Sequence, residues 1–248
     1  MHESSIISLK KLIPVSLHKY AIENYSKKLL IQLKKGKIIS KILKEKYFWN
    51  SKFKTTYDTL DPRWDSEILI EIFITKFKNI NVIQDKYTLV DICTGTGILG
   101  ISLMTEIKKL RTEFIDISHK ALQVCKKNIR NHKIWHKSKV NKISFEKYID
   151  LDKNKDFLIS NPPYLLKDEI NESLKDDPYI SLYGGNDGLY FYNLLAKYIK
   201  KNVKYFAIIE IDHMRSDLII NIFYRTGLKN IQIFKDYGGL NRCLYCET

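Results

Sequence analysis

The stretch Asn161-Pro162-Pro163-Tyr164, which directly follows the apolar run FLIS, suggests chemistry on a planar amino group. Two prolines stop a strand and stiffen the chain, so the groups around them keep a fixed direction. The side-chain carbonyl of Asn161 and the backbone carbonyl of Pro162 can accept hydrogen bonds from both hydrogens of an NH₂ group, and Tyr164 can stack on it. The lone pair of such a nitrogen is delocalised, and two fixed acceptors would direct it at an electrophile. We predict that these four residues are catalytic; a rigid turn that only ends a strand is the alternative.

A glycine-rich loop is the second chemical signal. In VDICTGTGILG, Gly95, Gly97 and Gly100 have the spacing G-x-G-x-x-G, and an acid, Asp116, lies about twenty residues further on. Glycines let the backbone approach a ligand closely, and the acid can accept hydrogen bonds from both hydroxyls of a ribose. The pattern predicts a cofactor that contains adenosine, although a tight strand-to-helix turn without a ligand also fits it.

The residues around the glycines favour one cofactor over another. Asp91 precedes the loop, where it would repel the pyrophosphate of a nicotinamide dinucleotide, and Thr94 and Thr96 add polar contacts that a phosphate cradle does not need. S-adenosylmethionine carries a positive sulfonium and a zwitterionic amino acid, so an acid beside the loop suits it better. We therefore predict S-adenosylmethionine as the cofactor.

The elements that must position these residues alternate along the chain. Apolar spacing predicts a helix over 17–43 that is interrupted at Gly36, and a second helix over 66–77. Strands are expected at 87–93, 112–117, 139–145, 155–160 and 204–211, with helices at 97–108, 119–132, 188–201 and 214–226. Such alternation predicts an α/β fold with a doubly wound, mostly parallel seven-stranded sheet, closed by an antiparallel hairpin of strands at 230–236 and 242–247. Glu210 would end one strand at the rim of the ligand crevice, either near substrate or in solvent.

Composition limits the function classes without choosing one. The chain has 248 residues, 44% of them apolar, and a net charge of +14 that comes mostly from lysine. Direct binding to nucleic acid is compatible with this charge but not required by it. No apolar run is long enough for a membrane span, and no secretory signal is evident. We expect a monomer in a reducing compartment, the cytoplasm, with an organellar matrix as the alternative.

Two pairs of residues resemble metal ligands but lack the rest of a site. Cys243 and Cys246 form C-x-x-C without a second pair, and His132 and His136 lie one helical turn apart without an intervening glutamate. A zinc site needs about four ligands in a defined spacing. We predict no metal.

Further motifs identify a family resemblance. D-x-x-T-G-T-G, the following acid and N-P-P-Y are similar to class I S-adenosylmethionine-dependent methyltransferases, which have a Rossmann-like fold. LDPRWDSEILIE (60–71), DPYISLYGGNDGLYFY (177–192) and KDYGGLNRCL (235–244) resemble the I-P-R-x-D-T-E, E-P-x-x-A-L-x-G-G-x-D-G-L-x-F-Y and K-D-x-x-G-x-x-R motifs of peptide chain release factor glutamine methyltransferases. The resemblance extends from about Lys27 to the C-terminus.

The resemblance implies methylation of the glutamine side-chain amide in the Gly-Gly-Gln motif of release factors, which would be the protein partners. Asn161 and Tyr164 would bind the substrate together with Arg63, Asp65 and Glu67. The cofactor-binding residues expected are Asp91, Cys93, Thr94, Gly95, Thr96, Gly97, Asp116, Phe145, Glu146 and Asn161.

Three departures from the family pattern affect the expected organisation. Residues 1–47 would form a shortened helical region that docks substrate, 48–77 a connector, and 78–248 the catalytic domain. In ISFEKY, Phe145 occupies the place of the usual acid near the adenine and Glu146 follows one residue later. Asp61 and Trp64 replace an apolar residue and a proline. A ribosomal-protein glutamine methyltransferase, a DNA or RNA amino methyltransferase and an inactive module that binds rRNA or translation factors remain alternatives.

Overall fold

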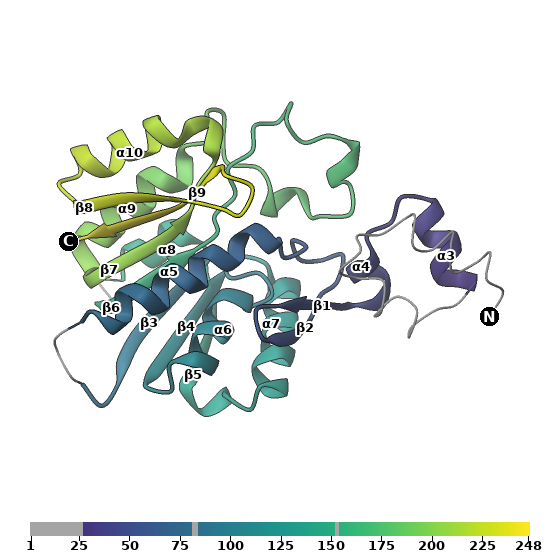
Figure 1. Cartoon of the computed structure of the whole chain (residues 1–248), viewed down its shortest axis with the longest axis horizontal. Coiled ribbons are helices and arrows are strands. Elements are labelled where there is room, and N and C mark those ends of the chain that lie inside the picture. Colours follow the sequence, from purple (N-terminus) through teal and green to yellow (C-terminus); the bar gives the residue numbers. More distant parts are fainter. Residues whose placement is uncertain (1–26, 81–83, 152–153) are drawn as a thin grey trace.

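A seven-stranded sheet organises the chain in the computed structural model, which describes residues 27–80, 84–151 and 154–248 (Figure 1). The strand order is β5-β4-β3-β6-β7-β9-β8. β3 to β7 run parallel, and β9 is antiparallel to both of its neighbours. The predicted doubly wound, mostly parallel sheet with a C-terminal hairpin is therefore confirmed. The strands are β3 (Tyr87–Ile92), β4 (Leu110–Asp116), β5 (Ser138–Lys142), β6 (Lys155–Ser160), β7 (Val203–Glu210), β8 (Lys229–Lys235) and β9 (Asn241–Glu247).

Helices cover both faces of the sheet. The central strands carry apolar side chains on both faces, and both faces must therefore be buried. In β3, Leu89 packs into one core cluster and Val90 into the other. The first cluster joins the sheet to α5 (Glu67–Lys78), α6 (Ile98–Glu106) and α7 (His119–Asn131). The second joins it to α8 (Phe145–Ile149), α9 (Tyr190–Asn202) and α10 (Ser216–Arg225).

The strand order reverses beside β3, and this reversal creates the ligand crevice. The chain leaves β3 for β4 and β5 on one side and returns to β6 on the other. Loops at the carboxyl ends of β3 and β6 therefore diverge, which is where open α/β sheets bind ligands. The glycine loop follows β3 and the Asn-Pro-Pro-Tyr corner follows β6.

The N-terminal part contains two short helices and a hairpin. α3 (Lys27–Lys34) and α4 (Ile39–Leu43) are separated at Gly36, whose φ is +74°, so the expected break is confirmed. The expected helix over 17–26 lies outside the described residues. β1 (Glu45–Phe48) and β2 (Ser51–Lys54) pair as an antiparallel hairpin that the sequence did not predict. Figure 1 shows α3 and α4 at one end of the molecule, beyond this hairpin.

The predicted end of the strand over 139–145 is wrong. β5 ends at Lys142, whereas a strand was expected to reach Phe145. Ser144 caps α8, since its hydroxyl accepts a hydrogen bond from the backbone N–H of Lys147. Phe145 therefore begins a helix. Short 3-10 helices complete the fold at Trp64–Ser66, Trp135–Lys137, Glu172–Leu174, Tyr179–Ser181 and His213–Arg215.

The described residues contain neither a membrane-spanning helix nor a cluster of metal ligands. None of their helices is long and apolar enough to cross a bilayer. Within the same ranges, no group of three or more His, Cys, Asp or Glu side chains could hold a metal ion. Cys243 and Cys246 are both buried on β9, but they pack into opposite core clusters and so point to opposite faces of the sheet.

Candidate active site

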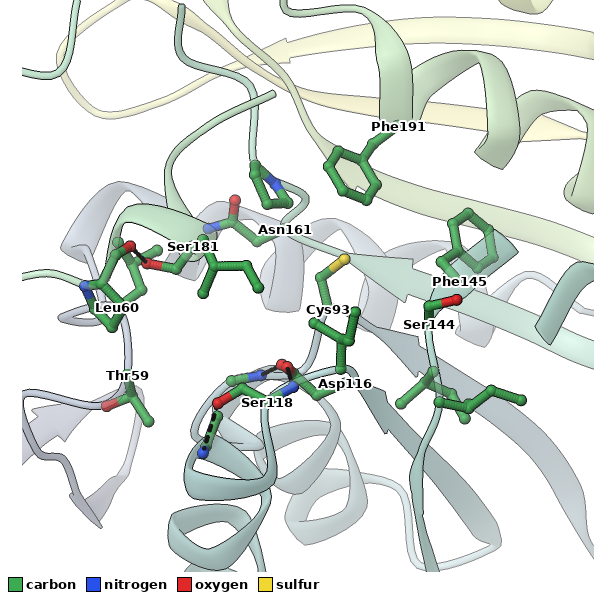
Figure 2. A pocket seen from close by; sticks show the side chains of 18 of the residues that line it. Thr59, Leu60, Cys93, Asp116, Ser118, Ser144, Phe145, Asn161, Ser181 and Phe191 are labelled. Carbon is green, nitrogen blue, oxygen red and sulfur yellow. Dashed lines mark hydrogen bonds between the residues drawn. The ribbon is translucent and has the colours of Figure 1, made fainter. Parts of the chain in front are cut away.

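A pocket lies at the carboxyl ends of β3, β4 and β6. Together with the solvent at its open mouth, it comprises about 840 Å³ of space that protein atoms do not fill. Figure 2 shows Asp116 and Ser118 on one side of the pocket, Phe145 and Phe191 on another, and Asn161 near Leu60 and Ser181. The residues that line it are Asp58, Thr59, Leu60, Cys93, Gly95, Ile115, Asp116, Ile117, Ser118, Ala121, Ile143, Ser144, Phe145, Glu146, Asn161, Pro163, Pro178, Ile180, Ser181 and Phe191.

Asp116 fixes one wall of the pocket. Its Oδ2 accepts a hydrogen bond from the Gly95 backbone N–H at 2.8 Å, and its Oδ1 accepts one from the Ser118 N–H at 2.8 Å. Burial raises the pKa of this carboxyl, although these backbone donors oppose the shift. Each carboxylate oxygen can still accept from a second donor, as the two hydroxyls of a ribose would require.

Gly95 leaves room on the loop side of the pocket. Its φ is +54°, and an ideal Cβ built there would meet no atom within 4 Å. A side chain would therefore extend into open space beside the pocket instead of clashing with the protein. The absence of a Cβ keeps the backbone accessible to a ligand, as expected of a cofactor loop.

Asp91 holds the Gly95–Gly100 loop through hydrogen bonds and does not line the pocket. Its side chain is 1% exposed, and Oδ2 accepts hydrogen bonds from Thr94 Oγ1 at 2.7 Å and from the Gly100 N–H at 3.0 Å. Burial raises the pKa of Asp91 to about 7. Thr94 and Thr96 are also buried and outside the lining; the Thr96 carbonyl accepts from Asn128 Nδ2 at 2.9 Å. These polar groups fold the loop, whereas Gly95 and Asp116 face the pocket.

The wall formed by α8 and α9 is aromatic. Phe145 and Phe191 both line the pocket, and the Phe145 ring also packs edge-on against Tyr198 with centroids 5.8 Å apart. Glu146 accepts a hydrogen bond from Tyr190 Oη at 2.8 Å. Burial opposes ionisation of Glu146, but its own backbone N–H and Tyr190 outweigh that effect and lower its pKa. A flat aromatic ligand could therefore pack against this aromatic wall, with a carboxylate nearby.

Cys93 and Gly97 complete the glycine loop. Cys93 lines the pocket at φ +56°, and burial raises the pKa of its thiol. Gly97 begins α6 at φ +80°, where a Cβ would lie 2.7 Å from Cys125 Sγ. Gly97 is thus required for packing against α7, and the structure does not place it in the pocket lining.

The Asn-Pro-Pro-Tyr corner separates this pocket from a second one. The second pocket, of about 410 Å³, shares Leu60, Asn161, Pro163 and Ser181 with the first. Its remaining lining residues are Arg63, Pro162, Tyr164, Leu165, Leu174, Leu182 and Glu210. The corner therefore lies where a group held in one pocket can meet a group held in the other.

Asn161 has one half of its amide fixed and the other half open. Nδ2 donates a hydrogen bond to Glu210 Oε2 at 2.8 Å. No described residue donates to Oδ1, and this atom is not among the buried polar atoms that lack partners, so it is accessible. The carbonyl that the sequence assigned to binding an amino group is available for that contact.

The segment 184–188 packs closely against the backbone of the Asn-Pro-Pro-Tyr corner. The Gly184 N–H donates to the Leu165 carbonyl at 2.9 Å, and the Leu165 N–H donates to the Leu182 carbonyl at 2.9 Å. A Cβ on Gly184 would lie 2.4 Å from Tyr164 Cα, and one on Gly188 would lie 2.6 Å from the Tyr164 carbonyl oxygen. Only glycine permits this close approach, which explains the GGNDG sequence.

The three charged residues predicted at the entrance separate in the structure. Arg63 lines the second pocket and donates to Asp177 Oδ2 at 2.6 Å. Asp65 is exposed and lines neither pocket. Glu67 accepts the Trp49 backbone N–H at 2.7 Å and so faces the β1–β2 hairpin. Arg63 is therefore the member of this trio that the structure places beside Asn161.

A buried charge cluster adjoins the second pocket through Arg63. Asp177 accepts from the Asp61 backbone N–H at 2.7 Å and forms ion pairs with Arg63 and, at 3.1 Å, with the fully buried Lys41. Asp61 is 2% exposed, and its carboxylate accepts hydrogen bonds from Ser40 Oγ and, at 2.9 Å, from Lys46 Nζ. The unusual Asp61 is thus fully partnered, and the cluster joins α4 to the second pocket.

Sequence reasoning missed several residues of the site. Ser118, Phe191 and Ser181 line the first pocket. Phe191 and Ser181 lie within the 177–192 motif, which was recognised as a whole without a role for either residue, and Ser118, the N-cap of α7, belongs to no motif. Glu210 was left between substrate contact and solvent; it is 2% exposed, which excludes the solvent alternative. Its partner Ser66 is 144 residues away in the chain, a pairing that local patterns cannot reveal.

Comparisons with known proteins agree with this geometry. A family described as Methyltransferase small domain matches residues 60–177. The chain is 34% identical over 224 residues to a release factor glutamine methyltransferase of Mycoplasma mycoides, covering 87% of this chain and 78% of that protein. It is likewise 34% identical to the enzyme of that name from Dictyoglomus turgidum, covering 88% and 78%. A solved structure of human methyltransferase 10 domain containing protein superposes with a TM-score of 0.55 at 15% identity, over 76% of this chain and 85% of that one.

Proposed function

This chain belongs to the release factor glutamine methyltransferase family, and from that membership we propose that it methylates the side-chain amide nitrogen of the glutamine in the Gly-Gly-Gln motif of peptide chain release factors. It is a methyltransferase of the class I fold. The observation that carries the substrate proposal is the position of the Asn-Pro-Pro-Tyr corner, which lines both pockets and leaves Asn161 Oδ1 accessible.

The first pocket fits S-adenosylmethionine. Its apolar lining around Phe145 and Phe191 suits adenine, the carboxylate of Asp116 suits the ribose hydroxyls, and the open space at Gly95 suits the methionine moiety. When bound, this cofactor supplies a methyl group whose transfer to nitrogen breaks a carbon–sulfur bond and releases one proton. The buried Asp91 acts on the cofactor only through the loop that it braces.

The second pocket fits the substrate glutamine. Asn161 Oδ1 and the Pro162 carbonyl accept hydrogen bonds from the amide nitrogen, and Tyr164 packs on the amide plane. These contacts draw electron density from the N–H bonds toward the nitrogen and orient its lone pair toward the first pocket. Because the acceptors are held by prolines and by the 184–188 loop, they need little reorganisation when the substrate enters.

The remaining parts of the chain divide the work of docking. In this proposal residues 1–47 grip the release factor, residues 48–77 connect this region to the site, and residues 78–248 carry out catalysis. The cluster of Lys41, Asp61 and Asp177 supports the division, because it ties α4 directly to the entrance. The enzyme acts as a monomer in the same compartment as the ribosome, and it needs no metal and no nucleic acid.

A labelling experiment tests this function. The purified chain is incubated with S-adenosylmethionine labelled on the methyl group and with a purified release factor, and the labelled peptides are mapped. We expect label on the Gly-Gly-Gln peptide and none on a factor in which that glutamine is replaced by glutamate. Label on nucleic acid or on a ribosomal protein instead would refute the substrate assignment, and calorimetry without any heat of cofactor binding would indicate an inactive binding module.

A further inference from the structure

Glu210 is a buried carboxylate beside the Asn161 corner that the mechanism above does not use. It ends β7, is 2% exposed, and lines the second pocket but not the first. The backbone carbonyl of Glu210 also accepts a hydrogen bond from Tyr192 Oη at 3.2 Å. Both its side chain and its backbone are therefore fixed.

Three hydroxyl or amide groups converge on this carboxylate, two from the Asn-Pro-Pro-Tyr corner and one from the start of α5. Oε2 accepts from Asn161 Nδ2 at 2.8 Å and from the hydroxyl of Ser66, the N-cap residue of α5. Oε1 lies 3.4 Å from Tyr164 Oη. The carboxylate thus joins α5 to the Asn-Pro-Pro-Tyr corner.

The charge of Glu210 determines which way the Asn161 amide faces. An ionised carboxylate only accepts hydrogen bonds, so the asparagine must present Nδ2 to it, and Oδ1 must then face away. The opposite orientation would put two oxygen acceptors together in a buried site and turn an NH₂ group toward the substrate's own NH₂ group. Each of these contacts is repulsive.

From this geometry we propose that Glu210 is a positioning residue that holds Asn161 with Oδ1 toward the transferred amide. The inference rests on the proposed function for the identity of that amide. Glu210 does not line the cofactor pocket, and in this proposal it acts on the amide through Asn161. Its removal should therefore lower kcat and leave cofactor affinity unchanged.

Protonation of Glu210 should reverse its effect on Asn161. A neutral carboxyl carries a proton that needs an acceptor, and Asn161 Oδ1 can supply one after the amide rotates by half a turn. Burial raises the pKa of Glu210, and the hydrogen bond from Ser66 lowers it. The titratable or charged groups that face it or interact with it from neighbouring elements are Asp65, Tyr164, Tyr192, Arg242 and Cys243.

Three variants separate this role from a structural one in measurements of kcat against pH. Glu210→Gln removes the titration while keeping the shape, so the acid limb that Glu210 causes should disappear, and kcat near pH 8 should fall less than in Glu210→Ala. We expect about a 10- to 100-fold loss for Glu210→Ala. Ser66→Ala should move the acid limb upward by about one pH unit, because it removes a hydrogen bond to the ionised form.

Glu113→Gln is the matched control. Glu113 is also a buried strand carboxylate that accepts from an asparagine, Asn141 Nδ2, but it belongs to β4, from which β3 and β6 separate β7, and it lines neither of the two pockets. Its substitution should leave the pH profile of kcat unchanged. An acid limb that persists in Glu210→Gln, or a change of cofactor affinity as large as the change of kcat, would overturn the proposal.

A spectroscopic measurement keeps the proposal testable even without turnover. With asparagine labelled by ¹⁵N, the side-chain amide signal of Asn161, identified by its loss in Asn161→Ala, should shift with pH in the wild type and stay constant in Glu210→Gln. If no release factor is methylated by the wild type, the proposed function fails, while this titration still decides whether Glu210 sets the amide. A signal that ignores pH in the wild type would refute the contact.

Discussion

Replacing Gly184 by alanine should displace the backbone of the catalytic corner without changing any side chain that lines either pocket. An ideal Cβ at this position would lie 2.4 Å from Tyr164 Cα, 2.7 Å from the Tyr164 carbonyl carbon and 2.9 Å from the Pro163 oxygen. These are backbone atoms, so no side-chain rotation can relieve the overlap. Ordinary carbon contacts lie at about 3.5–4.0 Å, and the two segments must therefore separate by about 1 Å.

A displacement of this size has a large effect on catalysis and a small one on cofactor binding. Misplacing a reacting group by ~1 Å costs on the order of 100-fold in rate. Gly184 lines neither pocket. The cofactor side of the first pocket is formed by Asp116, which ends β4, and by the loop after β3 that contains Gly95. We therefore expect kcat for release factor methylation to fall about 100-fold while the Kd for S-adenosylmethionine, measured by calorimetry, stays within about threefold.

Gly227→Ala provides the control for backbone strain. Gly227 has φ +80° beyond α10, and its Cβ would approach only the flexible end of Lys200 at 3.8 Å. This substitution should cost about 1–2 kcal/mol of stability, because it places a Cβ in the left-handed region, and it should leave kcat unchanged. If Gly184→Ala turned over at the wild-type rate, or lost activity only in proportion to unfolding, the reasoning about the corner would be refuted.

Two further substitutions test the first pocket, and a third tests the buried carboxylate of Asp91. Asp116→Asn should weaken S-adenosylmethionine binding about 10- to 100-fold by calorimetry, because it removes a charged acceptor from the ribose position; unchanged affinity would place the ribose elsewhere. Asn161→Ala should abolish methyl transfer and leave cofactor affinity largely intact, and retained turnover would contradict the mechanism. Asp91 has a folded pKa of about 7, above its unfolded value, so it binds a proton more tightly when folded and its contribution to stability declines as pH rises from about 4 to 7. Asp91→Asn should therefore be more stable than the wild type at pH 8, by roughly 4 kcal/mol at most, and urea unfolding at pH 5 should show a smaller gap; an equal gap at both pH values would show that Asp91 does not titrate as described.

The sequence was most informative where a local pattern decides the structure. Alternation of strands and helices predicted the sheet, and chain order placed the glycine loop and the Asn-Pro-Pro-Tyr corner at one edge of it. The β1–β2 hairpin was missed because Trp49, not a glycine, has φ +50° in its turn. Residue type alone does not reveal such a conformation.

The direction of individual side chains was harder to predict than the location of the site. Asp91 and Asp116 are both acids at the ends of neighbouring strands, yet one lies beneath the loop and the other faces the pocket. Glu67 turns to the Trp49 N–H, which belongs to a hairpin that the sequence did not predict. Contacts between distant segments decide these orientations, so spacing along the chain carries no record of them.

Asp61 is a position at which substitution by the residue usual in the family should not stabilise this protein. Changing a residue to the one most frequent in a family often raises stability by about 0.5–2 kcal/mol. Here an apolar residue at position 61 would strand the hydroxyl of Ser40 and the ammonium of Lys46, both of which donate to Asp61 in a site with little access to water. Residues 40, 46 and 61 must therefore be changed together. A library of single substitutions would reject an apolar residue at position 61 that is tolerated only when the other two positions change as well.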